Sequence, residues 1–81
     1  MSEPQQVDPV ELDTKGLLCP MPVIRTQDKI KQMEPGQRLL VQATDPGTCH
    51  DIPAWCRVHG HQIVDQSEQA QIFYFEILVG E

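Results

Sequence analysis

Hydrophobic and polar residues alternate in four segments of the chain, a period of two that is typical of strands with one buried face. The last segment is the most regular, because one of its faces is wholly apolar and consists of Phe73, Phe75, Ile77 and Val79. The polar residues 67–70 before it form a loop that is short enough for an antiparallel hairpin. The four predicted strands cover residues 10–15, 37–44, 61–66 and 72–79.

Two helices are predicted between these strands. The first begins near Pro22, because proline is favoured at the first helical position, and it ends at Pro35-Gly36. Its apolar stripe has helical spacing and consists of Val23, Thr26, Ile30 and Met33. The second is predicted over 51–59 after an irregular turn, since Pro53 would remove an interior hydrogen bond from a longer helix. One side of it carries Ile52, Trp55, Cys56 and His59.

The resulting order is strand, helix, strand, helix, strand, strand. Two helices cannot easily cover both faces of a four-stranded sheet, so the simplest arrangement places both on one face. The predicted fold class is therefore α/β, an α+β two-layer sandwich with a four-stranded mixed sheet and one open face. A single domain over 7–81 holds these elements, and residues 1–6 are predicted to be a flexible polar tail.

Composition narrows the possible functions. The chain has 81 residues, of which 12 are acidic and 6 basic, and its formal net charge is −6. Direct nucleic-acid binding relies on clustered Lys and Arg, so we do not expect it. No apolar run approaches the roughly 20 residues of a membrane span. The first residues lack the pattern of a signal peptide, so we expect a cytoplasmic protein. We also expect the protein to be monomeric in isolation.

The most specific motif is Cys19-Pro20-Met21-Pro22, which lies just before the first predicted helix. A helix N-terminus favours an anion, lowers the pKa of a nearby thiol and so promotes the nucleophilic thiolate. The two prolines fix the backbone, and an exposed sulfur anion on a rigid loop suits sulfur transfer. Pro22 occupies the position of the second cysteine of a Cys-x-x-Cys redox motif. The alternative is that Cys19 is a small buried hydrophobe.

Other polar residues have weaker interpretations. Lys15, Arg25 and Lys29 could raise the local potential near Cys19, although scattered cations are more often a solvated face. Cys56 is expected to pack in the core. The role of Cys49 stays open, because a Cys49 thiol near Cys19 could resolve a persulfide or form a disulfide. Five residues have side chains of the types that bind zinc, but their spacing matches no zinc motif and we expect no metal site: Cys49, His50, Cys56, His59 and His61.

The chain resembles the TusA/SirA-like family of small sulfur carriers from about residue 10 to its C-terminus. The resemblance rests on Leu12-Asp13-x-x-Gly16-x-x-Cys19-Pro20-x-Pro22, then Pro35-Gly36, Asp45-Pro46, Asp51-Ile52-Pro53-x-x-Cys56 and Gly60-His61. It implies an α/β sandwich and a sulfurtransferase in which Cys19 carries persulfide sulfur, with no metal or organic cofactor. The position between the two prolines is often acidic in tRNA-thiolating members and is Met21 here.

The resemblance also implies which proteins exchange the sulfur. Donors would be cysteine desulfurases or rhodaneses, and acceptors would be carriers of the DsrE type or related proteins, in tRNA thiolation, molybdenum-cofactor work or sulfur oxidation. Two other functions remain possible from the residues alone. One is a thiol redox or regulatory module that uses Cys19 with Cys49. The other is a non-catalytic interaction domain, in which the Cys19 thiol would have an ordinary pKa.

Overall fold

The computed structural model describes residues 8–80. The predicted tail, residues 1–6, lies outside the described residues, as do both ends of the predicted domain, residues 7 and 81. Within 8–80 neither helix is long and apolar enough to cross a membrane.

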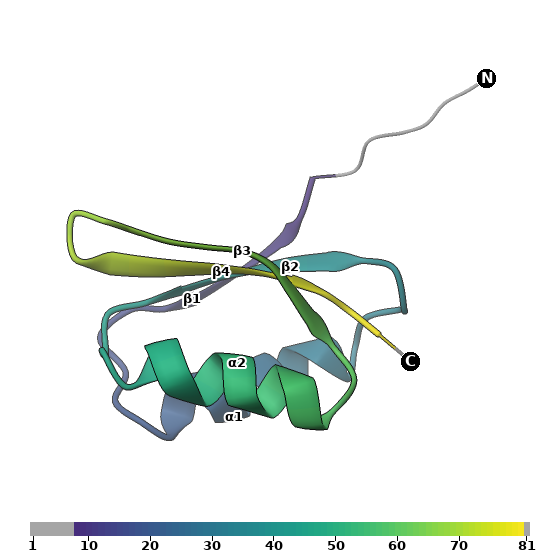
Figure 1. Cartoon of the computed structure of the whole chain (residues 1–81), viewed down its shortest axis with the longest axis horizontal. Coiled ribbons are helices and arrows are strands. Elements are labelled where there is room, and N and C mark those ends of the chain that lie inside the picture. The colour runs from purple at the N-terminus through teal and green to yellow at the C-terminus, as the bar shows by residue number, and fades with distance from the viewer. Residues whose placement is uncertain (1–7, 81) are drawn as a thin grey trace.

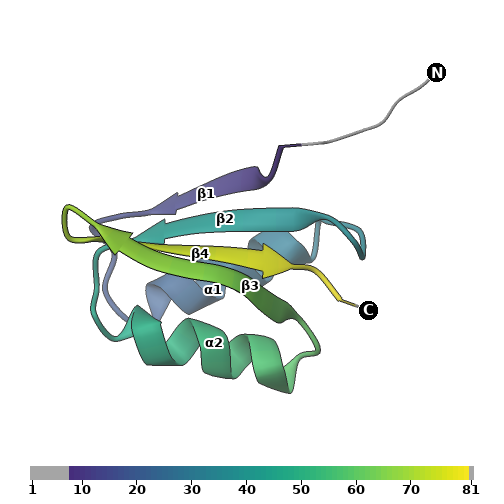
Figure 2. The same ribbon diagram turned by 45° about the horizontal axis from the view of Figure 1, so that its top comes forward.

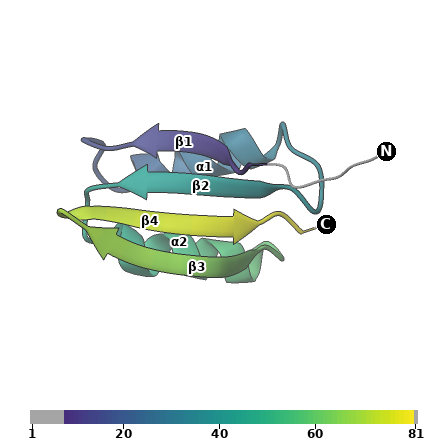
Figure 3. The ribbon, with the colours of Figure 1, turned by 90° about the horizontal axis from the view of Figure 1, so that it is seen from above.

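The elements follow one another in the predicted order, with two helices under one face of a four-stranded sheet (Figure 1). They are β1 (Val10–Thr14), α1 (Met21–Ile30), β2 (Arg38–Ala43), α2 (Thr48–Val58), β3 (Gln62–Gln69) and β4 (Ile72–Leu78). The spatial order of the strands is β1-β2-β4-β3 (Figure 3). β1 runs parallel to β2, and the other neighbours are antiparallel. The predicted mixed sheet with one open face is therefore confirmed.

The core lies between the sheet and the helices. In β2 every second residue is buried, and Leu39 and Val41 pair in register with Ile77 and Phe75 of β4. The apolar face predicted for the last strand is the central part of this core, although Phe73 at its start is only partly buried. The helices contribute Ile30, Ile52 and Cys56. The alternating pattern of the sequence thus predicts which faces are removed from water.

The first helix is shorter than expected and ends at Ile30, well before Pro35-Gly36. Its last turn loosens because the N–H groups of Gln32 and Met33 donate to carbonyls only three residues back. Met33 still packs against the core from this turn, so its place in the apolar stripe does not require a helix.

The prediction that Pro53 excludes a longer second helix is wrong, because α2 begins at Thr48 and contains Pro53. Proline in this position removes the hydrogen bond to the Cys49 carbonyl, in the second turn of the helix, and crowds that carbonyl with its ring. Burial of Ile52 and Cys56 on either side of it favours the helical backbone. Gly60 follows the helix with a φ of +81°, a conformation that glycine adopts without strain.

The hairpin is tighter than the predicted loop over 67–70. β3 continues to Gln69, which pairs with Ile72, so that only Ala70 and Gln71 form the turn. Both have positive φ, at +54° and +66°. Two left-handed residues match the twist of the flanking strands, and this match favours pairing up to the end of the hairpin.

Candidate functional site

Cys19 lies in the loop between β1 and α1, one residue before Pro20 at the helix N-cap. The carbonyl of Pro20 accepts hydrogen bonds from the N–H groups of Val23 and Ile24, both at 3.1 Å. Pro22 is fully buried and anchors the first helical turn, whereas Cys19 is exposed. The interpretation of Cys19 as a buried hydrophobe is therefore wrong, and the loop presents its thiol to solvent.

The start of α2 lies beside this loop. Because β1 and β2 are parallel, their carboxyl ends meet at one edge of the sheet, and the loops to α1 and α2 leave the sheet there (Figure 2). The Cys19 backbone N–H donates to Asp45 Oδ2 at 2.7 Å. The Cys19 thiol donates to Asp51 Oδ2, also at 2.7 Å. Two carboxylates, one just before α2 and one in its first turn, thus hold the cysteine.

Asp45 is itself held in place by the beginning of α2. Its Oδ1 accepts the N–H of Gly47 at 3.2 Å, and its carbonyl accepts the Thr48 hydroxyl at 2.6 Å. A further bond joins the two loops, from the Gly16 N–H to the Thr44 hydroxyl at 2.9 Å. The position of Cys19 relative to α2 is therefore fixed by backbone and side-chain hydrogen bonds on both sides.

The electrostatic environment of Cys19 is the reverse of the one expected from its helix terminus. Its pKa is raised, chiefly by the hydrogen bond to Asp51, then by partial desolvation and by the negative charges of Asp51 and Asp45. A thiol that donates to a carboxylate is stabilised in its protonated form. The prediction of a thiolate promoted by the N-terminus of α1 therefore does not hold for the resting protein.

The three cations predicted near the site lie in different settings. Lys15 Nζ is 2.8 Å from Gln42 Oε1 and 3.2 Å from Asp13 Oδ2, so a neighbouring carboxylate offsets its charge. Arg25 and Lys29 lie further along α1, six and ten positions after Cys19. The charges that shift the Cys19 pKa are the two aspartates, and none of these cations is among them.

Three exposed apolar side chains lie within five positions of Cys19 in the sequence. Leu18 is 73% exposed, Ile24 42% and Met21 37%. Leu18 comes immediately before Cys19, while Met21 and Ile24 are three residues apart and share one face of α1. The site thus combines an exposed thiol, two carboxylates that bond to the cysteine, and exposed apolar side chains nearby in the sequence.

The other two cysteines are less accessible. Cys56 is 1% exposed and belongs to the core, as predicted, and burial raises its pKa to about 11. Cys49 is partly buried against the core, and its pKa is raised first by burial and then by the charge of Glu68. Cys19 is therefore the one exposed thiol of the three.

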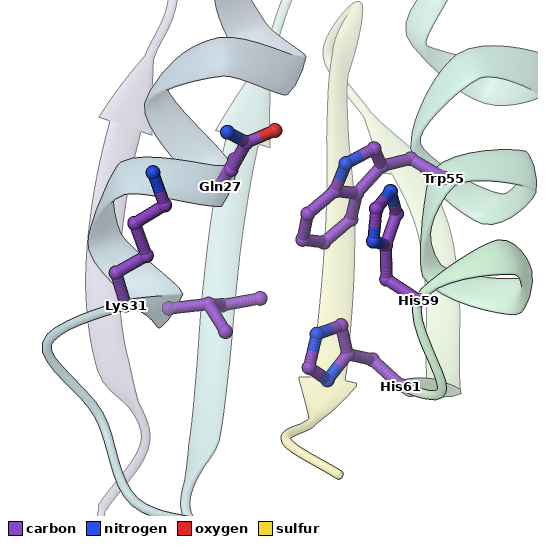
Figure 4. Close-up of a pocket in the computed structure, with 6 residues that line it drawn as sticks. Gln27, Lys31, Trp55, His59 and His61 are labelled. Carbon is purple, nitrogen blue, oxygen red and sulfur yellow. The ribbon is translucent and has the colours of Figure 1, made fainter. Parts of the chain in front are cut away.

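Two of the three histidines, His59 and His61, lie beside Trp55. The rings of His59 and His61 lie 4.7 Å and 5.3 Å from the indole, centre to centre. Both rings line a groove of about 330 Å³. In Figure 4 they face Gln27 of α1 and Lys31, which comes directly after the last residue of α1. Among residues 8–80 no three His, Cys, Asp or Glu side chains are grouped so that they could hold a metal ion.

These features define a small two-layer α/β domain that presents a single exposed thiol in a Cys-Pro-x-Pro loop, and known proteins of this kind match the chain. The family model described as sulfurtransferase TusA matches residues 10–79, and the chain belongs to this family. It is 44% identical over 79 residues to the sulfur carrier protein TusA of Pseudomonas syringae, covering 93% of each chain. The Pseudomonas aeruginosa protein of the same name is 44% identical over 66 residues, covering 82% of this chain and 84% of that one.

The fold also matches that of a solved structure. The SirA-like protein from Desulfitobacterium hafniense superposes with a TM-score of 0.79 at 23% identity, covering 89% of this chain and 99% of that one. At this identity the match concerns the fold, and it agrees with the four-stranded mixed sheet and the two helices.

Proposed function

We propose that this protein is a sulfur carrier that holds transferable sulfur on Cys19 as a persulfide. The observation that supports the proposal best is that Cys19 is the one exposed cysteine and lies in the Cys-Pro-x-Pro loop. Membership of the TusA family and the name of the Pseudomonas relatives support the same role.

The chemistry exchanges one sulfur–sulfur bond for another. Cys19 Sγ attacks the outer sulfur of a donor persulfide, R–S–SH, and a new bond forms between them. The donor's S–S bond breaks, and its inner sulfur leaves with the electron pair and takes up a proton. The products are Cys19–S–SH and R–SH, so the cysteine is oxidised to the persulfide level as the donor is reduced. In a second exchange an acceptor thiolate attacks the outer sulfur and releases Cys19. Neither exchange requires a metal or an organic cofactor.

The partners in this proposal are proteins. A donor of the cysteine desulfurase or rhodanese class would supply the sulfur, and a downstream carrier of the DsrE type or a related protein would receive it. Leu18, Met21 and Ile24 offer an apolar rim for docking around the thiol. The net charge of −6 favours basic docking surfaces on these partners, and raising the salt concentration should then slow transfer.

The proposed pathway is dissimilatory sulfur oxidation or the synthesis of 2-thiouridine in tRNA, in the cytoplasm. Met21 stands where tRNA-thiolating members often have an acidic residue, and it changes the surface beside the thiol. In either pathway the protein exchanges sulfur with other proteins and does not contact nucleic acid directly.

Mass spectrometry of the intact protein tests the proposal. After incubation with a persulfidated donor protein and removal of the donor, the wild type should gain the mass of one sulfur atom. Cys19→Ser should gain none, and Cys49→Ser should gain as much as the wild type. An equal gain in Cys19→Ser would refute the assignment.

A redox module that uses Cys19 with Cys49 is the second candidate. Cys49 is in the first turn of α2, two residues before Asp51, which contacts the Cys19 thiol. Mild oxidation followed by thiol counting distinguishes the two functions. A sulfur carrier keeps three free thiols, whereas a redox module shows one after forming a Cys19–Cys49 disulfide.

A further inference from the structure

The site contains a group that the sulfur exchange requires. A thiol that attacks another sulfur must lose its proton, and a group within about 2.6–3.2 Å of the sulfur can receive it. Asp51 Oδ2 lies 2.7 Å from Cys19 Sγ and accepts the hydrogen bond of the thiol. The proton is therefore already directed at a base before a donor arrives.

We propose that the Asp51 carboxylate is the general base of the sulfur exchange, and this inference rests on the proposed function of Cys19. As Sγ attacks the outer sulfur of a neutral donor persulfide, the thiol proton moves to Asp51 Oδ2. The new S–S bond forms, the donor's S–S bond breaks, and the donor thiolate leaves with the electron pair. The protonated Asp51 then returns a proton to the donor thiolate directly or through water. Charge and atoms balance, and no additional oxidant or reductant enters.

Asp45 does not share this role, although it lies as close to the cysteine. Its Oδ2 accepts the backbone N–H of Cys19, and its Oδ1 accepts the N–H of Gly47. Asp45 therefore orients the loop, while Asp51 contacts the reacting atom. Each residue contributes one negative charge, but only Asp51 accepts the thiol proton. Comparing a variant of each therefore separates the effect of losing a charge from the effect of losing the proton acceptor.

The surrounding charges explain why a base is needed. The charged groups acting on Cys19 are Asp51, on α2, and Asp45, just before α2, and both favour the protonated thiol. Free thiolate is therefore scarce at neutral pH, and attack by a preformed thiolate would be slow. A carboxylate that takes up the proton during the attack avoids this requirement.

The test is the pH dependence of the loading rate, measured by rapid quenching and intact mass. Glutathione persulfide serves as the donor, because a small donor does not depend on a protein docking surface. The quantity compared is the rate of the wild type divided by that of Asp51→Asn, since the titration of the donor cancels in this ratio. General base catalysis typically contributes about 10²–10⁴-fold, and the additional thiolate of the variant offsets part of it, so we expect a ratio of about 10 to 100 near pH 6.5, falling toward one as the pH rises above the pKa of the thiol.

The sign of the effect at neutral pH decides between two roles of Asp51. If Asp51 only holds the thiol protonated, the Asp51→Asn variant should load sulfur faster than the wild type, because it has more thiolate. A general base makes the variant slower despite its additional thiolate. Asp45→Asn removes an equal charge just before α2 but leaves the proton acceptor in place, so it should not show the tenfold or larger loss of rate near pH 6.5. Asp51→Glu retains a carboxylate and should recover part of the pH profile of the wild type, while circular dichroism checks the fold of every variant.

Two results would overturn this inference while leaving Cys19 as the carrier. One is that Asp51→Asn loads at least as fast as the wild type at neutral pH, and the other is that the two pH profiles run parallel. If the wild type and Cys19→Ser both fail to gain sulfur even from a persulfidated donor protein, the proposed function itself is wrong. The two failures are therefore distinguishable in one set of samples.

Discussion

The Cys19 thiol and the Asp51 carboxylate lie 2.7 Å apart in space and 32 positions apart in the chain. The pair joins the Cys-Pro-x-Pro loop to the second helix at the edge of the sheet where two parallel strands end. This contact is the largest cause of the raised pKa of the thiol, and it places a carboxylate beside the sulfur that is to react.

The first prediction concerns the titration of Cys19. Its rate of alkylation by iodoacetamide should rise with pH to a midpoint above the ordinary range of a cysteine, because the hydrogen bond to Asp51 raises the pKa. In Asp51→Asn the midpoint should move to lower pH, whereas Asp28→Asn, an exposed change on α1, should not move it. A midpoint that is the same in all three proteins would contradict the described contact.

A second prediction concerns the order in which the three thiols react in the native protein. Cys19 is exposed and should react first with a disulfide reagent, followed by the partly buried Cys49. Cys56 is in the core with a pKa of about 11, so it should react only after the addition of denaturant. Peptide mapping during the reaction gives the order directly. Early modification of Cys56 would show that the core around α2 opens more readily than its packing indicates.

The hairpin turn offers a stabilising substitution. Gln71 has a φ of +66°, a left-handed conformation that glycine adopts without steric cost. Gln71→Gly should therefore raise the free energy of unfolding by about 1 kcal/mol. Gln69→Gly is the matched control, because this residue is paired with Ile72 in the strand and its loss should lower that free energy by about 0.5–1 kcal/mol. Urea denaturation measures both, and a destabilising effect of Gln71→Gly would contradict the turn geometry.

His61 should make stability fall in mild acid. Burial, and then the charge of His59, lowers its pKa, and its Nδ1 accepts the Gly80 N–H at 2.9 Å. The unfolded chain therefore binds a proton more readily than the folded chain. This contribution to stability is complete above about pH 6.5 and declines as the pH falls through the lowered pKa of the folded state.

The same prediction can be isolated with two variants. Denaturation midpoints between about pH 7.5 and 5 should fall less for His61→Gln than for the wild type. His50→Gln, which changes an exposed histidine, should behave as the wild type. A wild-type slope that persists in His61→Gln would assign the acid sensitivity to another group.

Much of the fold could be predicted because local patterns determine it. The alternation over Phe73 to Val79 indicates a strand with one buried face, and the structure buries that face. The ends of elements were harder to predict, since Pro53 and the hairpin turn depend on what tertiary packing and strand twist allow. A single sequence pattern does not report the balance between one lost hydrogen bond and the burial of Ile52.

The site was predicted only in part. Cys19 is recognisable from its loop and from the prolines around it, but the sequence alone did not place Asp45 or Asp51 beside its thiol, although both belong to the family motif. Their approach to the thiol follows from the parallel pairing of β1 and β2, which brings polar residues after the two strands to one edge. The predicted order of elements therefore already indicated that the residues after the first two strands could lie close together. Reading only the residues next to Cys19 gave the wrong direction for its pKa.

The most direct test of the central claim is to locate the sulfur after loading. The protein is incubated with a persulfidated cysteine desulfurase, separated from it, alkylated and digested, and the peptides are analysed by mass spectrometry. If Cys19 is the carrier, the additional sulfur is found between Cys19 and the alkyl group, and Cys49 and Cys56 carry none. Additional sulfur on Cys49, with Cys19 alkylated directly, would contradict the account.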